Sequence, residues 1–222
     1  DFGVLDRLQR ALTPRLRIDP ATLGYLQLVV SELEKQLVQG KPTNWPGLLF
    51  TAINQLGFYT NLLESHVERD ERIILLIGEA CLLIGDVLFN MHDYTNAERH
   101  YKMALHASQE APSVALHAIA SGRYGLLLID TERYNEAEQL LENALRLANQ
   151  DISSVVCSWL WAVKAEAHAN KQEERPCYEA LATAREQLSL NRDRMECYIF
   201  NADLVPSVYG TTKILGFEGA CY

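Results

Sequence analysis

The feature that most constrains the fold is a self-similarity of the chain at a spacing of about 40 residues. Small residues recur as small residues at this spacing, and large apolar residues recur as large ones. The matching pairs are Gly85 and Gly125, Leu88 and Leu128, Tyr94 and Tyr134, Ala97 and Ala137, and Ala104 and Ala144. A third copy is weaker and is carried by Ala165, Cys177, Leu181 and Ala184. A fixed period of roughly 20–50 residues indicates units that bury their apolar surface against neighbouring units.

Each unit has the pattern of two helices. Apolar residues recur with helical spacing, alternation typical of strands is nearly absent, and Pro and Gly gather between the periodic stretches. Asp19 before Pro20 is a typical helix start, because Asp caps free amides and Pro suits the first helical position. The expected helices are 20–39, 46–68, 71–91, 95–109, 113–130, 135–149, 153–170 and 175–190. The sequence therefore predicts an all-α protein.

The small residues indicate how the helices pack. A small residue on the first helix of a pair, such as Gly85 or Gly125, lets the second helix approach closely. Ala97 and Ala137 do the same from the second helix, and Tyr101 and Leu141 fill the adjoining space. Stacking of such pairs gives an α-solenoid, a superhelix of antiparallel helix pairs with a repeat of about 40 residues.

These positions resemble the tetratricopeptide repeat, in which a small residue and a large one precede Tyr-x-x-Ala, a large residue and Ala. The repeat of that family is usually about 34 residues long, so this chain resembles a divergent, long-repeat variant. The family's early Trp is absent at Cys81 and Ser121 and present at Trp161. From Arg15 to Tyr222 the chain is also similar to C-terminal regions of bacterial helix-turn-helix transcription regulators.

The repeats suggest a division of the chain into three parts. We expect a degenerate N-terminal helix pair in 1–70, and repeats at 71–110, 111–150 and 151–190. Residues 191–222 are expected to hold an irregular connector and the first helix of a truncated further repeat. The chain begins at Asp1 without Met, and we expect it to be a piece of a longer protein.

Composition narrows the class of partner. A net charge of −9 and the absence of basic runs argue against direct nucleic-acid contact. No uninterrupted apolar run reaches the roughly 18 residues of a membrane span, so no membrane contact is expected. The five cysteines are an odd number without a Cys-x-x-Cys pair, which favours reduced thiols and a cytoplasmic location.

The sequence lacks a recognisable catalytic pattern. Its histidines have no zinc-ligand spacing, and no phosphate-binding loop or nucleophile motif is present. We therefore expect a non-enzymatic protein without a cofactor or a bound metal.

In tetratricopeptide repeats the first helix of each pair lines the concave face, and the resemblance implies a candidate binding surface there. Its positions are Glu79, Leu82, Asp86, Phe89, Asn90, Leu126, Asp130, Trp159, Glu166 and Asn170. Asn90, Asp130 and Asn170 occupy one position in three successive repeats and form a polar ladder. The ladder either holds the backbone of an extended peptide or caps the ends of three helices. Trp159 either contacts a ligand or packs between units.

Two functions remain open at this point. The first is a peptide-binding or protein-binding module, the sensing region of a bacterial transcription regulator, whose acidic face favours a neutral or basic partner. The second is a constitutive assembly scaffold, for instance a homodimer, with no small ligand.

Overall fold

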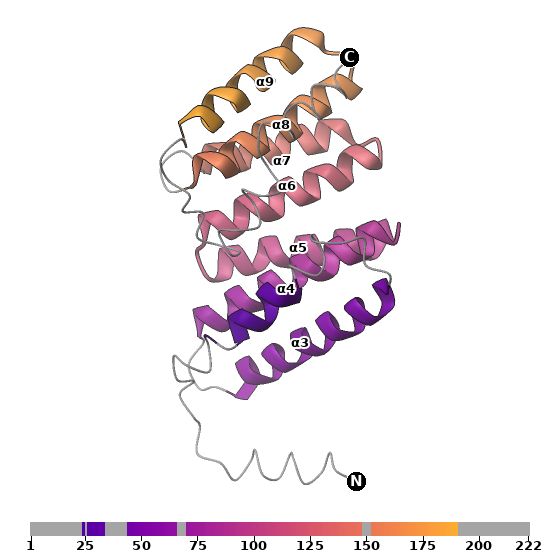
Figure 1. Cartoon of the computed structure of the whole chain (residues 1–222), viewed down its shortest axis with the longest axis vertical. Coiled ribbons are helices and arrows are strands. Elements are labelled where there is room, and N and C mark those ends of the chain that lie inside the picture. The colour runs from indigo at the N-terminus through magenta and orange to yellow at the C-terminus, as the bar shows by residue number, and fades with distance from the viewer. Residues whose placement is uncertain (1–23, 25, 34–43, 66–69, 148–151, 191–222) are drawn as a thin grey trace.

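The helices of a computed structural model stack side by side along one axis (Figure 1). The structure describes residues 24, 26–33, 44–65, 70–147 and 152–190, and all regular structure within them is helical. The named helices are α3 (Trp45–Ser65), α4 (Glu71–Asn90), α5 (Tyr94–Glu110), α6 (Val114–Asp130), α7 (Tyr134–Leu147), α8 (Ser154–Asn170) and α9 (Glu174–Ser189). Each contacts the next along the chain. The predicted α-solenoid is confirmed.

The expected helix boundaries agree closely with the structure. Every helix from α3 to α9 begins within one residue of its predicted start. Residues 26–33 are helical, inside the predicted helix 20–39. The expected connector and truncated repeat at 191–222 lie outside the described residues, as do Cys197 and Cys221. The predicted three-part division of the chain stays a prediction.

Short polar side chains explain where several helices begin. The carboxylate of Asp93 accepts a hydrogen bond from the backbone N–H of Asn96 at 3.2 Å, at the start of α5. Ser113 caps α6 in the same way through Leu116, also at 3.2 Å. Such caps satisfy backbone donors that have no partner inside the helix, and each stabilises a helix by about 1 kcal/mol.

A left-handed residue closes the turn inside each repeat. His92, Glu132 and Gln172 have φ angles of 61°, 60° and 62°, and they occupy the same position in successive repeats. In the first turn the N–H of Asp93 donates to the carbonyl of Leu88 at 2.9 Å, and equivalent bonds close the other two turns. Helices commonly end in this conformation, usually with glycine. The repeat is thus visible in the backbone as well as in the side chains.

One continuous apolar core runs through the stack. Buried residues from α4 to α8 form a single cluster, and it includes the repeated small positions Ala97, Ala104, Ala137 and Ala144. The N-terminal end adds a second cluster in which Tyr59 of α3 is fully buried. Its hydroxyl donates to the carbonyl of Leu26 at 3.1 Å. The helical segment 26–33 is therefore packed against α3.

Helix α4 is more apolar than the sequence patterns suggested. By length and composition alone it could cross a membrane, although no uninterrupted apolar run of that length exists. Two thirds of its most apolar 18-residue stretch is buried inside the protein. Its apolar surface is therefore used in packing against α3, α5 and α6.

Candidate protein-interaction face

The first helices of the three pairs lie next to one another. Helix α4 contacts α6, and α6 contacts α8, in addition to the contacts between successive helices. The second helices, α5, α7 and α9, make no comparable set of contacts with one another in the described part of the chain. Helices on the inside of a superhelix are closer together than those on the outside. Helices α4, α6 and α8 therefore form the inner wall.

Burial sorts the predicted positions of this wall into layers. Leu82 and its equivalents in the next two repeats, Gly122 and Ala162, are buried between the helices. Asp86, Leu126 and Glu166 are half-buried, and Asn90, Asp130 and Asn170 are exposed. These last two layers, together with Phe89, form the accessible part of the wall, which we call the inner face. Leu82, with no exposed surface, belongs to the core and cannot contact a partner.

The two asparagines of the ladder bond to their own helices. The Asn90 amide donates to the carbonyl of Asp86 at 2.7 Å, and the Asn170 amide donates to the carbonyl of Glu166 at 2.9 Å. Each bond folds the amide back onto the carbonyl one turn earlier in its own helix, which is a contact within the fold and not with a ligand. Both side chains are nevertheless exposed, and an amide carries a second donor hydrogen and an acceptor oxygen. Contact between the ladder and a peptide stays a prediction.

Asp86 is engaged within the fold. One carboxylate oxygen accepts the hydroxyl of the buried Tyr101 at 2.9 Å. The other pairs with the guanidinium of Arg123 on α6. Asp86 thus joins α4, α5 and α6, and its charge is balanced by Arg123. The sequence pattern did not single out Arg123, because its counterparts in the preceding and following repeats are Leu83 and Val163.

Asp130 and Glu166 make up the acidic part of the inner face. Burial raises the pKa of the Glu166 carboxyl, and the negative charge of Asp130 raises it further. Asp130 is exposed, but partial desolvation of its carboxyl group raises its pKa, and the neighbouring His92 opposes that shift. The two carboxylates come from α6 and α8 and interact unfavourably with each other. A cation placed between them would relieve this repulsion.

The larger side chains of the wall have mixed surroundings. Phe89 is half-buried, and its ring centroid is 5.7 Å from that of Tyr94. Trp159 is also half-buried, and its ring lies so close to Gly122 that a Cβ there would clash. Part of the Trp159 ring is therefore used in packing against the preceding unit. Glu79 is half-buried beside Tyr59, whose pKa is raised by burial and then by the charge of Glu79.

A second polar cluster lies between the last two repeats. Glu138, His168 and Glu173 have ligand atoms close enough to hold a metal ion. The ammonium group of Lys171, however, lies 2.8 Å from Glu138 and 2.9 Å from Glu173. His168 bonds to Glu173 at 2.7 Å. Lys171 already supplies the positive charge that the two carboxylates require, so the cluster is an ion-pair network that joins α7, α8 and the following turn.

The equivalent network one repeat earlier is built around Glu98. Its carboxylate accepts the hydroxyl of Tyr124 at 2.7 Å and the Arg133 guanidinium at 2.9 Å, and Lys102 pairs with it at 2.7 Å. Glu98 and Glu138 occupy the same position in successive repeats, so each lies at the equivalent contact between one repeat and the next. The recurrence of glutamate at this position is the sequence signal that could have located these contacts.

The stacked helix pairs define this chain as a helical-repeat protein. Its accessible inner wall suits contacts with other proteins. The model of the family described as tetratricopeptide repeat matches residues 78–150. This part of the chain is a tetratricopeptide repeat domain, as the sequence pattern predicted, and such domains serve as protein-interaction modules. No curated protein matches the chain.

Proposed function

We propose that the inner face binds a neutral or basic peptide or protein segment. The observation that carries the proposal is the unfavourable pairing of Asp130 and Glu166 on the accessible part of the wall. The negative charge of Asp130 adds to the burial that raises the pKa of Glu166, and such destabilising carboxylates are commonly found at functional sites. A lysine or arginine of a partner would gain from both carboxylates at once.

The neighbouring residues supply what an extended backbone needs. Asn90, Asp130 and Asn170 recur along the stack at one position per repeat. Amide groups can both donate to and accept from peptide groups of a bound segment. Phe89 and Leu126 add half-buried apolar surface to the same face. A segment with one or two basic residues and small apolar residues between them fits this arrangement.

The test begins with selection of peptides from a displayed random library against the chain. We expect the enriched peptides to carry Lys or Arg and to lack Asp and Glu. Their affinity is then measured by fluorescence anisotropy for Asp130→Asn combined with Glu166→Gln. Loss of two interfacial charges should weaken binding at least about tenfold. The matched control is Glu174→Gln with Glu186→Gln, which removes two charges from exposed positions on α9.

A second double variant tests the ladder. Asn90→Ala with Asn170→Ala should weaken the same peptides with little loss of thermal stability. Enrichment of acidic peptides, or undiminished binding by both double variants, would exclude the inner face as the binding surface. Unfolding of the asparagine variant alone would show that the ladder only caps helices.

We further propose that the module is the sensing region of a larger bacterial transcription regulator located in the cytoplasm. The support is the resemblance of the long repeats and of the stretch from Arg15 onward to the C-terminal regions of such regulators. Sequencing of the complete reading frame tests it, since a helix-turn-helix domain on the same polypeptide is expected.

A further inference from the structure

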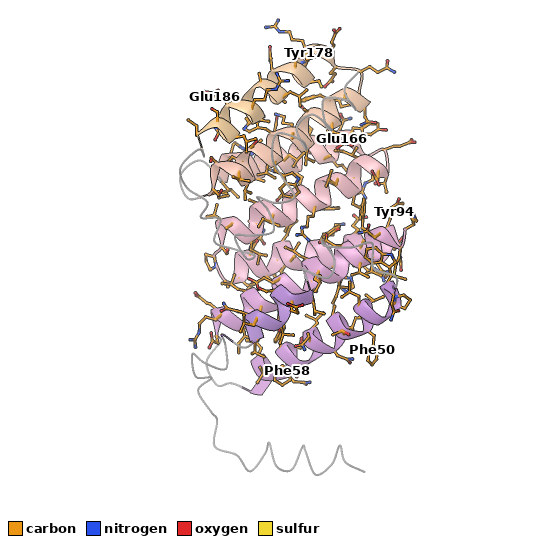
Figure 2. All side chains as sticks on the ribbon, viewed as in Figure 1. Phe50, Phe58, Tyr94, Glu166, Tyr178 and Glu186 are labelled. Atoms are coloured by element: carbon orange, nitrogen blue, oxygen red, sulfur yellow. The ribbon has the colours of Figure 1, made fainter. Side chains whose placement is uncertain are left out.

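The outer side of α3 carries an apolar stripe that no described residue covers. Phe50, Ile53 and Phe58 are 69%, 49% and 48% exposed. Their spacing places them on one side of the helix, opposite the buried Ala52 and Tyr59. Figure 2 shows Phe50 and Phe58 on α3, at the end of the stack away from α9. Three large apolar side chains in one stripe make a patch, which isolated exposed residues do not.

The two ends of the stack differ in polarity. The outer side of α9 is mostly polar: Arg175 and Glu179 are exposed and bonded to each other at 2.8 Å, although Tyr178 between them is 40% exposed. A polar outer face is what closes a repeat array at its end. Helix α3 has only one charged residue in its 21, Glu64 near its C-terminus. The α3 end therefore lacks the polar covering that the α9 end has.

Gly57 lies in the middle of this stripe, and no contact with the other described residues explains why this position is a glycine. A Cβ on Gly57 would meet no atom within 4 Å. Glycine inside a helix costs about 1 kcal/mol relative to alanine, and here no close neighbour among the described residues requires it. A glycine beside Phe58 does leave room for a side chain that approaches from outside.

We infer that the α3 stripe is the contact surface for a second copy of this chain. The contact is two-fold, with the two α3 helices antiparallel. A register that sets Phe50 of one copy against Phe58 of the other also sets each Glu64 against Asn44 of the other copy. Asn44 caps the N-terminus of α3 through the N–H of Gly47 at 2.9 Å.

Charge limits where a second copy can dock, and it permits docking on α3. A copy of a chain with a net charge of −9 is repelled by most of its own surface, and α3 offers an almost uncharged area. In the antiparallel register each Glu64 lies at the positive end of the partner's helix dipole, where a carboxylate is stabilised. The inner face on α4, α6 and α8 stays open in such a dimer. The inference is therefore independent of the proposed peptide binding.

The experiment is light scattering coupled to size exclusion, with sedimentation equilibrium to obtain the dimer dissociation constant. We expect the unchanged chain to be a dimer at micromolar concentration. Phe50→Glu should weaken the dimer at least about a hundredfold, because it places a charge in each half of an apolar contact. Gly57→Gln should weaken it as well, although the open space around Gly57 and the higher helix propensity of Gln predict a monomer at least as stable.

The matched control is Met103→Glu, at a side chain on α5 that is 51% exposed and outside the stripe. It should leave the dimer intact. Circular dichroism melts of all variants show whether each is folded. A chain that is monomeric even at about 100 µM, or a dimer that resists both Phe50→Glu and Gly57→Gln, would overturn the inference. A monomer that loses thermal stability with Phe50→Glu would assign the stripe to other residues of the same chain.

Discussion

The ring of Tyr101 on α5 lies against the backbone of Gly85 on α4, so that a Cβ on Gly85 would be 2.5 Å from a ring carbon. The ring is buried and its hydroxyl is bonded to Asp86, which leaves it no alternative position. The same contact one repeat later joins Gly125 to Leu141, where a Cβ would be 3.2 Å from the nearest side-chain atom. The two contacts occupy the same position in the repeat. The buried and hydrogen-bonded Tyr101 ring, however, can move less than the Leu141 side chain to make room for an added methyl group.

Gly85→Ala should therefore lower the free energy of unfolding, by about 1–3 kcal/mol for an overpacked contact. Gly125→Ala should be nearly neutral or stabilising, since a small shift of Leu141 accommodates the methyl group and alanine favours the helix by up to about 1 kcal/mol. Urea denaturation of both variants measures the difference. Equal losses in the two would show that the Tyr101 contact is not rigid.

The Glu98 joint predicts a dependence of stability on acid pH. Burial alone would raise the pKa of Glu98, but hydrogen bonds from Lys102, Tyr124 and Arg133 lower it to about 2. A depressed carboxyl pKa stabilises the fold above the unfolded value near 4.5, and this contribution is lost as the pH falls toward 2. Glu98→Gln should cost about 1 kcal/mol at pH 7, and the gap to the unchanged chain should close between pH 4.5 and 2. A gap that stays constant over this interval would rule out Glu98 as its source.

The left-handed turn residues offer a stabilising change. Glu132 has a φ of 60°, a conformation that costs most L-residues about 1 kcal/mol and glycine much less. Glu132→Gly should raise the free energy of unfolding by about 0.5–1 kcal/mol. The control is Glu136→Gly, four residues on in the first turn of α7, which should lower it because glycine weakens a helix. Thermal melts of the two variants should move in opposite directions.

The acidic pair on the inner face predicts a conflict between stability and binding. Asp130→Asn with Glu166→Gln should raise stability at pH 7, by up to about 1 kcal/mol, because it removes the cost of burial and of mutual repulsion. The gain should vanish as the pH falls through the raised carboxyl pKa values, where protonation removes the same cost. Urea denaturation at several pH values checks this. A loss of stability at pH 7 would mean that the pair has compensating partners and is not held for binding.

Helix boundaries and repeat period were accessible from sequence because both depend on short-range physics. Caps such as Asp93 and small residues such as Gly85 and Ala97 act within one helix pair. The side chains that line the inner face could be predicted from the sequence only in part. Leu82 and Asp86 were both expected to face inward, but Leu82 is fully buried and Asp86 is bonded to Arg123.

The sequence by itself determined an all-α chain of stacked helix pairs with a regular period, because hydrogen bonding and apolar spacing within one pair repeat along the chain. The tertiary structure alone decided that the charge of Asp130 on α6 acts on Glu166 of α8, that Lys171 occupies the Glu138 cluster, and that the α3 stripe lies at the end of the stack. These relationships join residues of different helices. They depend on how far each pair is rotated against the next, and no local pattern encodes that rotation.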